Sequence, residues 1–160
     1  MVWGGVSSQG KTTLRFVAPG TKVNSNCYIN KVLKPFLTRD VPRLFPKTRK
    51  IKWFFHQDSV PSYTARETIS FLDENKINYI KPEEWMPNSP DAAPMDYSIW
   101  EYLKQQLNKT HINSLDELKK KLLHEWRKMN QTYIDKVLAS WPKRVLMIYK
   151  ARGSHIEHRL

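Results

Sequence analysis

The sequence predicts an α/β fold, and three observations support this class. Short runs rich in β-branched and aromatic residues alternate with longer segments whose apolar residues recur at helical spacing. The apolar run 51–58 ends abruptly on the carboxylate of Asp58, at the kind of strand end where α/β sheets bind ligands. A capping box, Ser114-Leu-Asp-Glu117, opens a strongly periodic helix. The predicted order is β-β-α-β-α-β-α-α, a sheet flanked by helices.

The first predicted element is a β-hairpin. Residues 1–7 and 11–18 are two β-rich runs, and Ser8-Gln9-Gly10 separates them. A three-residue turn of this kind needs a residue that tolerates a positive φ, and Gly10 provides it. The chain is therefore expected to open on two antiparallel strands.

A helix is predicted near 25–37. Asn24 or Ser25 can cap it, and its apolar residues have helical spacing. Pro35 should end or bend this helix, because proline lacks the N–H that an interior position donates. The segment 39–50 contains two prolines and, after Asp40, four basic residues, and it is predicted to be a surface connection.

The remaining elements are predicted from periodicity and turn residues. Strands are expected near 51–58 and 77–80. Helices are expected near 63–75, 96–108, 115–130 and 132–149. Pro142 should interrupt the last helix. With 160 residues and no internal repeat, the chain is predicted to form a single domain over 1–160.

The composition indicates a polyanion as partner. The formal charge of +12 and the pI near 9.8 are typical of nucleic-acid binding. A membrane surface is the competing partner, but the sequence has no lipidation signal and no apolar run of the roughly 18 residues that span a bilayer. The single cysteine, Cys27, permits no internal disulfide, which fits a reducing compartment. We therefore expect a soluble intracellular protein.

Two carboxylates are candidate metal ligands. Asp58 follows a predicted strand, and Asp96 lies in a proline-rich turn that makes the entry to the next helix rigid. Carboxylate oxygens are the ligands that Mg²⁺ prefers. Each acid also has a structural alternative, Asp58 as the cap of a turn and Asp96 as a helix N-cap. Asp91, in the same turn as Asp96, is predicted to be a turn residue.

These motifs together resemble the catalytic domain of mariner-like transposases. The resemblance rests on His56-Gln-Asp58, on Pro61-x-x-x-Ala65 leading into a helix, on Ser89-Pro-Asp-x-x-Pro-x-Asp96-Tyr, and on the thirty-seven residues between the two acids. Val2-Trp3-Gly4-Gly5-Val6 is similar to the second strand of that family. The end of the chain, from Trp141 through Gly153-Ser-His155-Ile-Glu157, is similar to its closing segment.

The resemblance implies a ribonuclease H-like mixed sheet and a triad of acids that holds two Mg²⁺ or Mn²⁺ ions for DNA strand cleavage and joining. Asp58 and Asp96 would be catalytic, metal-binding members of the triad. The family's first strand is central and carries the first acid, and no such strand precedes the hairpin here, where Asp40 is the first acidic residue. The chain is therefore expected to be an N-terminally truncated domain that holds at most one ion weakly.

The sequence departs from the family pattern after Asp58. Ser59, Val60 and Tyr63 stand where the family has Asn, Ala and His, and a tyrosine assists proton transfer less readily at neutral pH. Three hypotheses follow. The chain is a DDE-type transposase domain for DNA transposition and integration that is impaired by the missing acid, an inactive transposase-derived nucleic-acid-binding module, or a degenerate fragment that does not fold alone. The resemblance implies a nuclear location and is compatible with a homodimer.

A basic run beside the Asp58 segment is the candidate DNA-binding surface. It consists of Lys47, Arg49, Lys50 and Lys52. These side chains can contact phosphates whatever the base sequence, and the alternative is a solvated charge run. The basic residues of the predicted helix 115–130 are expected to form its wet face. His155 and His158 flank Glu157, and this cluster is expected to be a frayed terminus and not a metal site.

Overall fold

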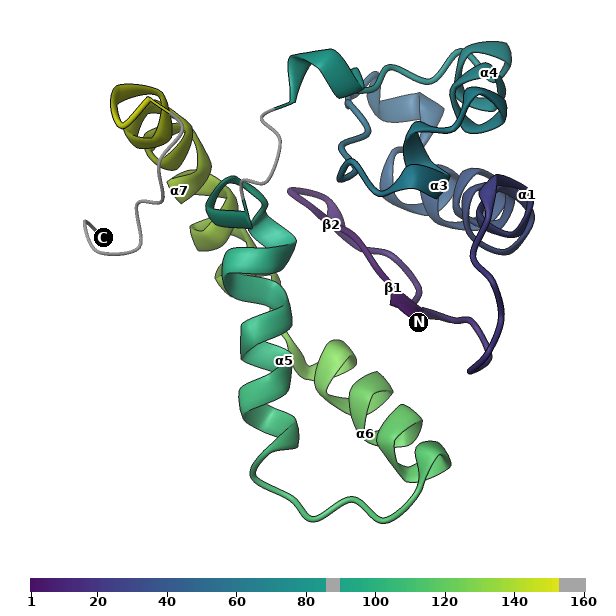
Figure 1. Ribbon diagram of the computed structural model, residues 1–160. Coiled ribbons are helices and arrows are strands. Elements are labelled where there is room, and N and C mark those ends of the chain that lie inside the picture. Colours follow the sequence, from purple (N-terminus) through teal and green to yellow (C-terminus); the bar gives the residue numbers. More distant parts are fainter. Residues whose placement is uncertain (86–89, 153–160) are drawn as a thin grey trace. The chain divides into compact units, whose positions relative to one another are not determined.

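A computed structural model of the chain describes residues 1–85 and 90–152 (Figure 1). The chain divides into two compact units. Unit 1 consists of Met1–Gly5 with Lys11–Pro87, and unit 2 of Val6–Gly10 with Asn88–Leu160. Each unit has its own buried residues.

The predicted hairpin is present, with shorter strands than expected (Figure 1). Strand β1 (Val2–Trp3) pairs antiparallel with β4 (Arg15–Phe16), and β2 (Val6–Ser7) pairs with β3 (Gly10–Lys11). Gly10 has a φ of 129°, so the turn does need glycine at this position. The two ladders are separated at Gly5, whose backbone N–H donates to the side-chain oxygen of Thr12 at 2.9 Å.

The strands expected near 51–58 and 77–80 are reduced to one parallel bridge between Phe55 and Tyr79. The Phe55 N–H donates to the carbonyl of Asn78 at 2.7 Å, and the Phe55 carbonyl accepts from Ile80 at 3.0 Å. No further strand pairs with this segment among residues 1–85 and 90–152. The expectation of two full strands was wrong because a ladder requires a partner along its whole length, and here only one residue of the run has one.

Pro35 does not end the first helix, and the segment 39–44 is not a surface connection. Helical backbone continues through α1 (Ser25–Tyr28), η1 (Ile29–Leu33), η2 (Phe36–Asp40) and α2 (Val41–Leu44). Both η segments are π-helical, and they flank Pro35. Such a widened turn accommodates a residue that has no N–H to donate, so the helix continues beyond the proline.

Apolar side chains from several of these elements form the core of unit 1. Its fully packed members are Trp3, Tyr28, Val32, Leu33, Phe36, Phe55 and Leu72. The chain completes the unit with η3 (Lys47–Arg49), α3 (Pro61–Thr64), α4 (Arg66–Glu74) and η4 (Pro82–Glu84). Extended backbone at Ala65, with φ −58° and ψ 143°, separates α3 from α4, where the sequence predicts one helix near 63–75.

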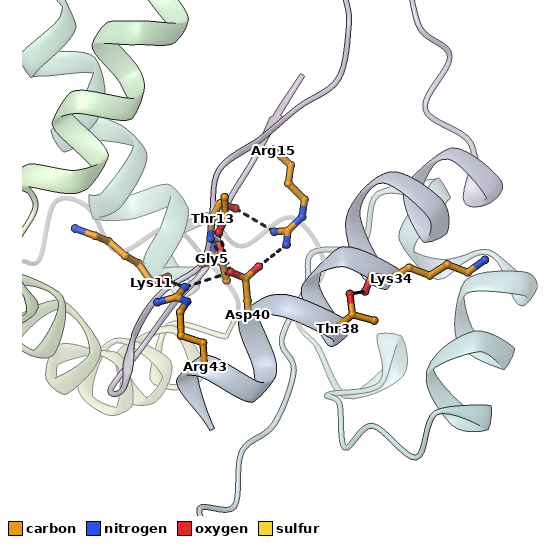
Figure 2. A network of polar contacts seen from close by, with 9 residues as sticks. Gly5, Lys11, Thr13, Arg15, Lys34, Thr38, Asp40 and Arg43 are labelled. Atoms are coloured by element: carbon orange, nitrogen blue, oxygen red, sulfur yellow. Dashed lines mark hydrogen bonds and ion pairs between the residues drawn. The ribbon is translucent and has the colours of Figure 1, made fainter. Parts of the chain in front are cut away.

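Asp40 is the centre of a buried polar network in unit 1 (Figure 2). Its carboxylate accepts hydrogen bonds from the backbone N–H and the hydroxyl of Thr13, at 2.9 and 3.0 Å. It also forms ion pairs with Arg15 and, at 3.2 Å, with Arg43. Arg43 donates in addition to the carbonyl of Lys11 at 2.7 Å. The hairpin is thereby joined to the end of the long helical segment.

Unit 2 is helical apart from the tip of the hairpin (Figure 1). It contains η5 (Pro90–Ala92), η6 (Met95–Ile99), α5 (Trp100–Leu107), α6 (Leu115–Lys128) and α7 (Gln131–Lys150). The predicted N-cap of α6 is confirmed, because Ser114 accepts from the Glu117 N–H at 3.1 Å. The second bond of the predicted capping box differs: the Glu117 carboxylate accepts from the N–H of Asn113 at 2.9 Å, one residue before the cap.

The interruption expected at Pro142 is absent, because α7 runs through this residue. A proline inside a helix costs roughly 3 kcal/mol through its lost hydrogen bond and the clash of its ring. Val137 and Ile148, on either side of Pro142, are buried. Burial of large aliphatic side chains contributes about 1.5–3 kcal/mol each, which is enough to keep the helix continuous.

Candidate functional site

Asp58 lies in unit 1, in an exposed turn just before α3. One of its carboxylate oxygens accepts a hydrogen bond from the backbone N–H of Val60 at 3.2 Å. The turn-capping role suggested as an alternative is therefore present. It leaves the exposed side chain accessible to water and ions, so the cap and a metal-binding role are compatible.

Gln57, the residue before Asp58, is hydrogen-bonded to residues of α1 and α3. The Tyr28 hydroxyl donates to Gln57 Oε1 at 2.9 Å, and Gln57 Nε2 donates to the Tyr63 carbonyl at 3.0 Å. The rings of Tyr28 and Tyr63 stack with their centroids 4.0 Å apart. This restraining role of Gln57 and Tyr28 was not predicted from the sequence, in which only the position of Gln57 beside Asp58 pointed to it. The bonds restrain the backbone that carries Asp58.

Tyr63, at the position where the resemblance predicts a histidine, is a neutral phenol at physiological pH. Burial, and secondarily the negative charge of Asp58, raise its pKa to about 12. A phenol with this pKa can donate a hydrogen bond at neutral pH, but it is not a general base there.

His56 is also neutral at physiological pH. Burial lowers its pKa to about 4. Its ring lies against Trp85 with the centroids 3.9 Å apart, and its buried Nε2 has no hydrogen-bond partner among the described residues. His56 is therefore a packed neighbour of the Asp58 segment.

Asp96 lies in unit 2, in the first turn of η6. Its side chain is exposed, and its backbone N–H donates to the Ala93 carbonyl at 2.9 Å. The N-cap position of η6 is occupied by Pro94, so the N-cap alternative for Asp96 is wrong. Asp91 lies in η5, as predicted for a turn residue, and is buried. Asp58 therefore belongs to unit 1, and Asp96 belongs to unit 2.

The donor chemistry of the two acids fits a hard divalent cation. Both are exposed carboxylates, and Mg²⁺ or Mn²⁺ takes oxygen ligands of this kind. Within residues 1–85 and 90–152, no group of three or more His, Cys, Asp or Glu side chains is placed to hold a metal ion. His155, Glu157 and His158 lie outside the described residues. Residues 153–157, the last part of the predicted closing segment, also lie outside them.

The candidate DNA-binding residues are all exposed in unit 1. Lys47 and Arg49 belong to η3, and Lys50 follows with a left-handed φ of 48°. Next to them, the rings of Phe45 and Trp53 stack with centroids 5.1 Å apart and planes at 12°. This stacked pair supports the backbone on both sides of the basic run, so the run projects from an ordered surface.

The basic residues of α6 have mixed surroundings. Lys119 pairs with Asp116 at 3.5 Å, and Lys121 pairs with the buried Glu125 at 3.3 Å. The remaining basic residues, Lys120, Arg127 and Lys128, are exposed. No helix within the described ranges is long and apolar enough to cross a bilayer.

Comparison with curated proteins reveals homologous transposases. No protein-family model matches the chain. The Tcb1 transposase of Caenorhabditis briggsae is 23% identical over 154 residues, which are 96% of this chain and 52% of that protein. The Tc1 transposase of Caenorhabditis elegans shows the same identity and coverage. The chain spans about half the length of these relatives.

Solved structures show the same fold. The catalytic domain of the Mos1 mariner transposase, solved with raltegravir and Mn, superimposes with a TM-score of 0.83 at 23% identity, covering 98% of this chain and 76% of that one. A Mos1 paired-end complex with Mn matches with a TM-score of 0.81 at 23% identity, covering 96% of this chain and 43% of that one. The chain therefore has a mixed α/β fold that matches the Mos1 catalytic domain and is mostly helical with small sheets.

The chain is therefore similar in sequence to the Tcb1 and Tc1 transposases and similar in fold to the catalytic domain of the Mos1 mariner transposase.

Proposed function

We propose that the chain contributes Asp58 and Asp96 as metal ligands to a DDE-type transposase domain that cleaves and joins DNA strands in the nucleus. The observation that carries the proposal is the homology to Tc1-type transposases over 96% of the chain. The Mos1 catalytic domain, of the same fold, has been solved with Mn and with Mg. Mos1 has also been solved in paired-end and strand-transfer complexes.

Divalent ions in such a domain activate the attacking oxygen and stabilise the leaving oxygen of a phosphodiester. In this chain, the exposed carboxylates of Asp58 and Asp96 would hold metal. Tyr63, protonated up to a pKa of about 12, would donate a hydrogen bond near Asp58 and would leave the removal of a proton to water. Gln57, through its bonds to Tyr28 and Tyr63, keeps the Asp58 turn in place for this role.

Metal binding provides the first test. Two carboxylates without a third bind a divalent ion weakly, so Mn²⁺ should bind with a dissociation constant of roughly a millimolar or weaker. Asp58→Asn and Asp96→Asn should each abolish this binding in calorimetry or Mn²⁺ paramagnetic resonance. Asp116→Asn is the matched control, since the Asp116 side chain is 83% exposed and lies on α6. Equal Mn²⁺ binding in the wild type and both variants would refute the proposal.

A second candidate function is nucleic-acid binding without chemistry. It is favoured by Tyr63, whose neutral phenol stands where the resemblance predicts a titratable histidine. Both candidates share the basic surface of unit 1. They differ in whether any form of the chain cuts DNA.

A nicking assay separates the two candidates. The 160-residue chain alone should give no measurable nicking of plasmid DNA, because displacing a metal by about 1 Å already costs on the order of 10²-fold in rate. Fusion to the half of the C. elegans Tc1 transposase that the chain does not cover should restore nicking, and Asp96→Ala in the fusion should remove it again. Nicking by the unaided chain that Asp58→Ala stops would contradict the expected need for a further acid. A fusion that never nicks would favour the binding module.

A further inference from the structure

The turn that carries Asp96 is attached to α7 by bonds from two side chains of that helix. Trp141 Nε1 donates to the carbonyl of Ala92 at 2.8 Å. Arg144 Nη1 lies 3.5 Å from the carbonyl of Asp91, a weaker polar contact that is longer than an ordinary N–H···O hydrogen bond. Ala92 and Asp91 are both buried, so these contacts hold the turn from its inner side. All of these residues belong to unit 2.

The residue after Asp96 is held by the same helix. The Tyr97 hydroxyl donates to the Val137 carbonyl at 2.8 Å and lies 3.1 Å from the Ser140 hydroxyl. The guanidinium of Arg144 stacks over the Tyr97 ring, 3.8 Å from its centroid. Arg144 therefore contacts the backbone before Asp96 and the ring directly after it. A planar guanidinium suits this double role, because it can donate in its plane and stack on its face.

We propose that Trp141 and Arg144 are positioning residues that hold the Ala92–Tyr97 turn and thereby fix the direction of the Asp96 carboxylate. Neither residue is placed to touch a metal ion itself. The consequence for metal binding rests on the proposed function of Asp96. Residues that orient a metal-binding side chain without touching the metal typically change the metal affinity by 10–100-fold when they are removed.

This role has a chemical logic. Asp96 lies in the first turn of η6, directly after the segment that α7 contacts, so the direction of its carboxylate depends on the backbone of this segment. The helical segments around Ala93 are short: η5 (Pro90–Ala92) ends directly before it, and η6 (Met95–Ile99) begins two residues after it. Without the contacts to α7, the turn would sample other conformations. Ordering the turn when a cation binds would then cost entropy and lower the affinity for the cation.

The test compares three single variants of the full chain. Trp141→Phe keeps the ring and removes the donor to Ala92, while Arg144→Gln removes the stack on Tyr97. Lys143→Gln is the matched control, because Lys143 is the exposed neighbour of Arg144 on α7 and loses the same charge. Amide hydrogen exchange of peptides covering 92–99 is measured against peptides from α6 as an internal standard, and Mn²⁺ affinity is measured alongside.

Loss of the contacts should speed exchange in 92–99 by about tenfold in Trp141→Phe and Arg144→Gln, with α6 and the melting temperature unchanged. Mn²⁺ affinity should fall by about tenfold in both. Lys143→Gln should leave exchange unchanged and bind Mn²⁺ equally or more tightly, because it only removes a positive charge. This opposite sign distinguishes positioning from a general charge effect.

Unchanged exchange in 92–99 in both variants would overturn the inference, whatever Mn²⁺ does. Faster exchange with unchanged Mn²⁺ affinity, while Asp96→Asn abolishes binding, would overturn the link from the turn to the metal. If Asp96→Asn has no effect on Mn²⁺ binding, the proposed function fails, and the exchange result still decides whether α7 holds the turn.

Discussion

Replacing Asp40 by asparagine should lower the free energy of unfolding of this chain by about 3–5 kcal/mol, the usual cost of removing one partner from a buried ion pair. The Asp40 and Arg15 side chains are only 1% and 11% exposed, so Arg15 would keep a buried charge without its partner. Urea unfolding followed by tryptophan fluorescence measures the change, since Trp3 lies in the same unit, with the Arg15 guanidinium 5.1 Å from its ring centroid.

Arg43→Gln is the control for this prediction. The Arg43 side chain is 54% exposed, so its pair with Asp40 should contribute no more than about 1 kcal/mol. An Asp40→Asn variant within about 1 kcal/mol of the wild type would show that the network does not stabilise the fold, because removing one partner of a stabilising buried pair costs several times more.

The same network predicts a dependence on pH. Burial alone would raise the pKa of Asp40, but hydrogen bonds from Arg15 and the Thr13 N–H, with the charge of Arg15, lower it on balance below its ordinary value of 3.8. The unfolded chain therefore takes up this proton first as the pH falls. The stability that the carboxylate contributes is fully present well above pH 3.8 and is lost as the pH falls through its lowered pKa. The difference between wild type and Asp40→Asn should shrink over that range.

DNA binding by the basic run should depend steeply on salt. Four phosphate contacts predict a slope of about −3.6 in a plot of log affinity against log salt, so affinity should fall about 10²-fold between 50 and 200 mM salt. The four residues concerned are Lys47, Arg49, Lys50 and Lys52, all exposed in unit 1. Their combined replacement by glutamine should remove most of this slope, as measured by fluorescence anisotropy with duplexes of unrelated sequence.

Charge alone must be separated from position in this experiment. Replacing Lys119, Lys120, Lys121 and Lys128 of α6 by glutamine removes the same formal charge from unit 2. This control should keep most of the slope, because two of these lysines already pair with acids. Equal losses in the two variants would show that net charge, and not the run beside Asp58, determines DNA affinity. No binding at low salt would remove nucleic acid as a partner.

Local chemistry made several elements predictable. Ser114 marked the start of α6, because its side chain accepts from the N–H of Glu117 within the same turn. Gly10 marked the hairpin turn, since its positive φ is a property of the residue itself. The position of Asp58 at the end of an apolar run made it a candidate metal ligand, and this role stays a prediction.

Other features depend on partners far away in sequence. Asp40 was assigned to a surface connection, yet it is buried because Thr13 and Arg15 meet it from the hairpin. Gln57 gains its role from Tyr28 and Tyr63, and the turn of Asp96 gains its support from α7.

The sequence by itself determined the family resemblance, the two candidate acids, the hairpin and the helix periodicity, because each of these depends on residue types at fixed local spacing. Only the tertiary structure decided that helical backbone passes Pro35 and Pro142, and that the run 51–58 pairs through Phe55 alone. A proline inside a helix persists when burial elsewhere outweighs its cost, and a strand exists only where another strand satisfies its N–H and C=O groups. Both conditions involve residues distant along the chain, so local patterns could not reveal them.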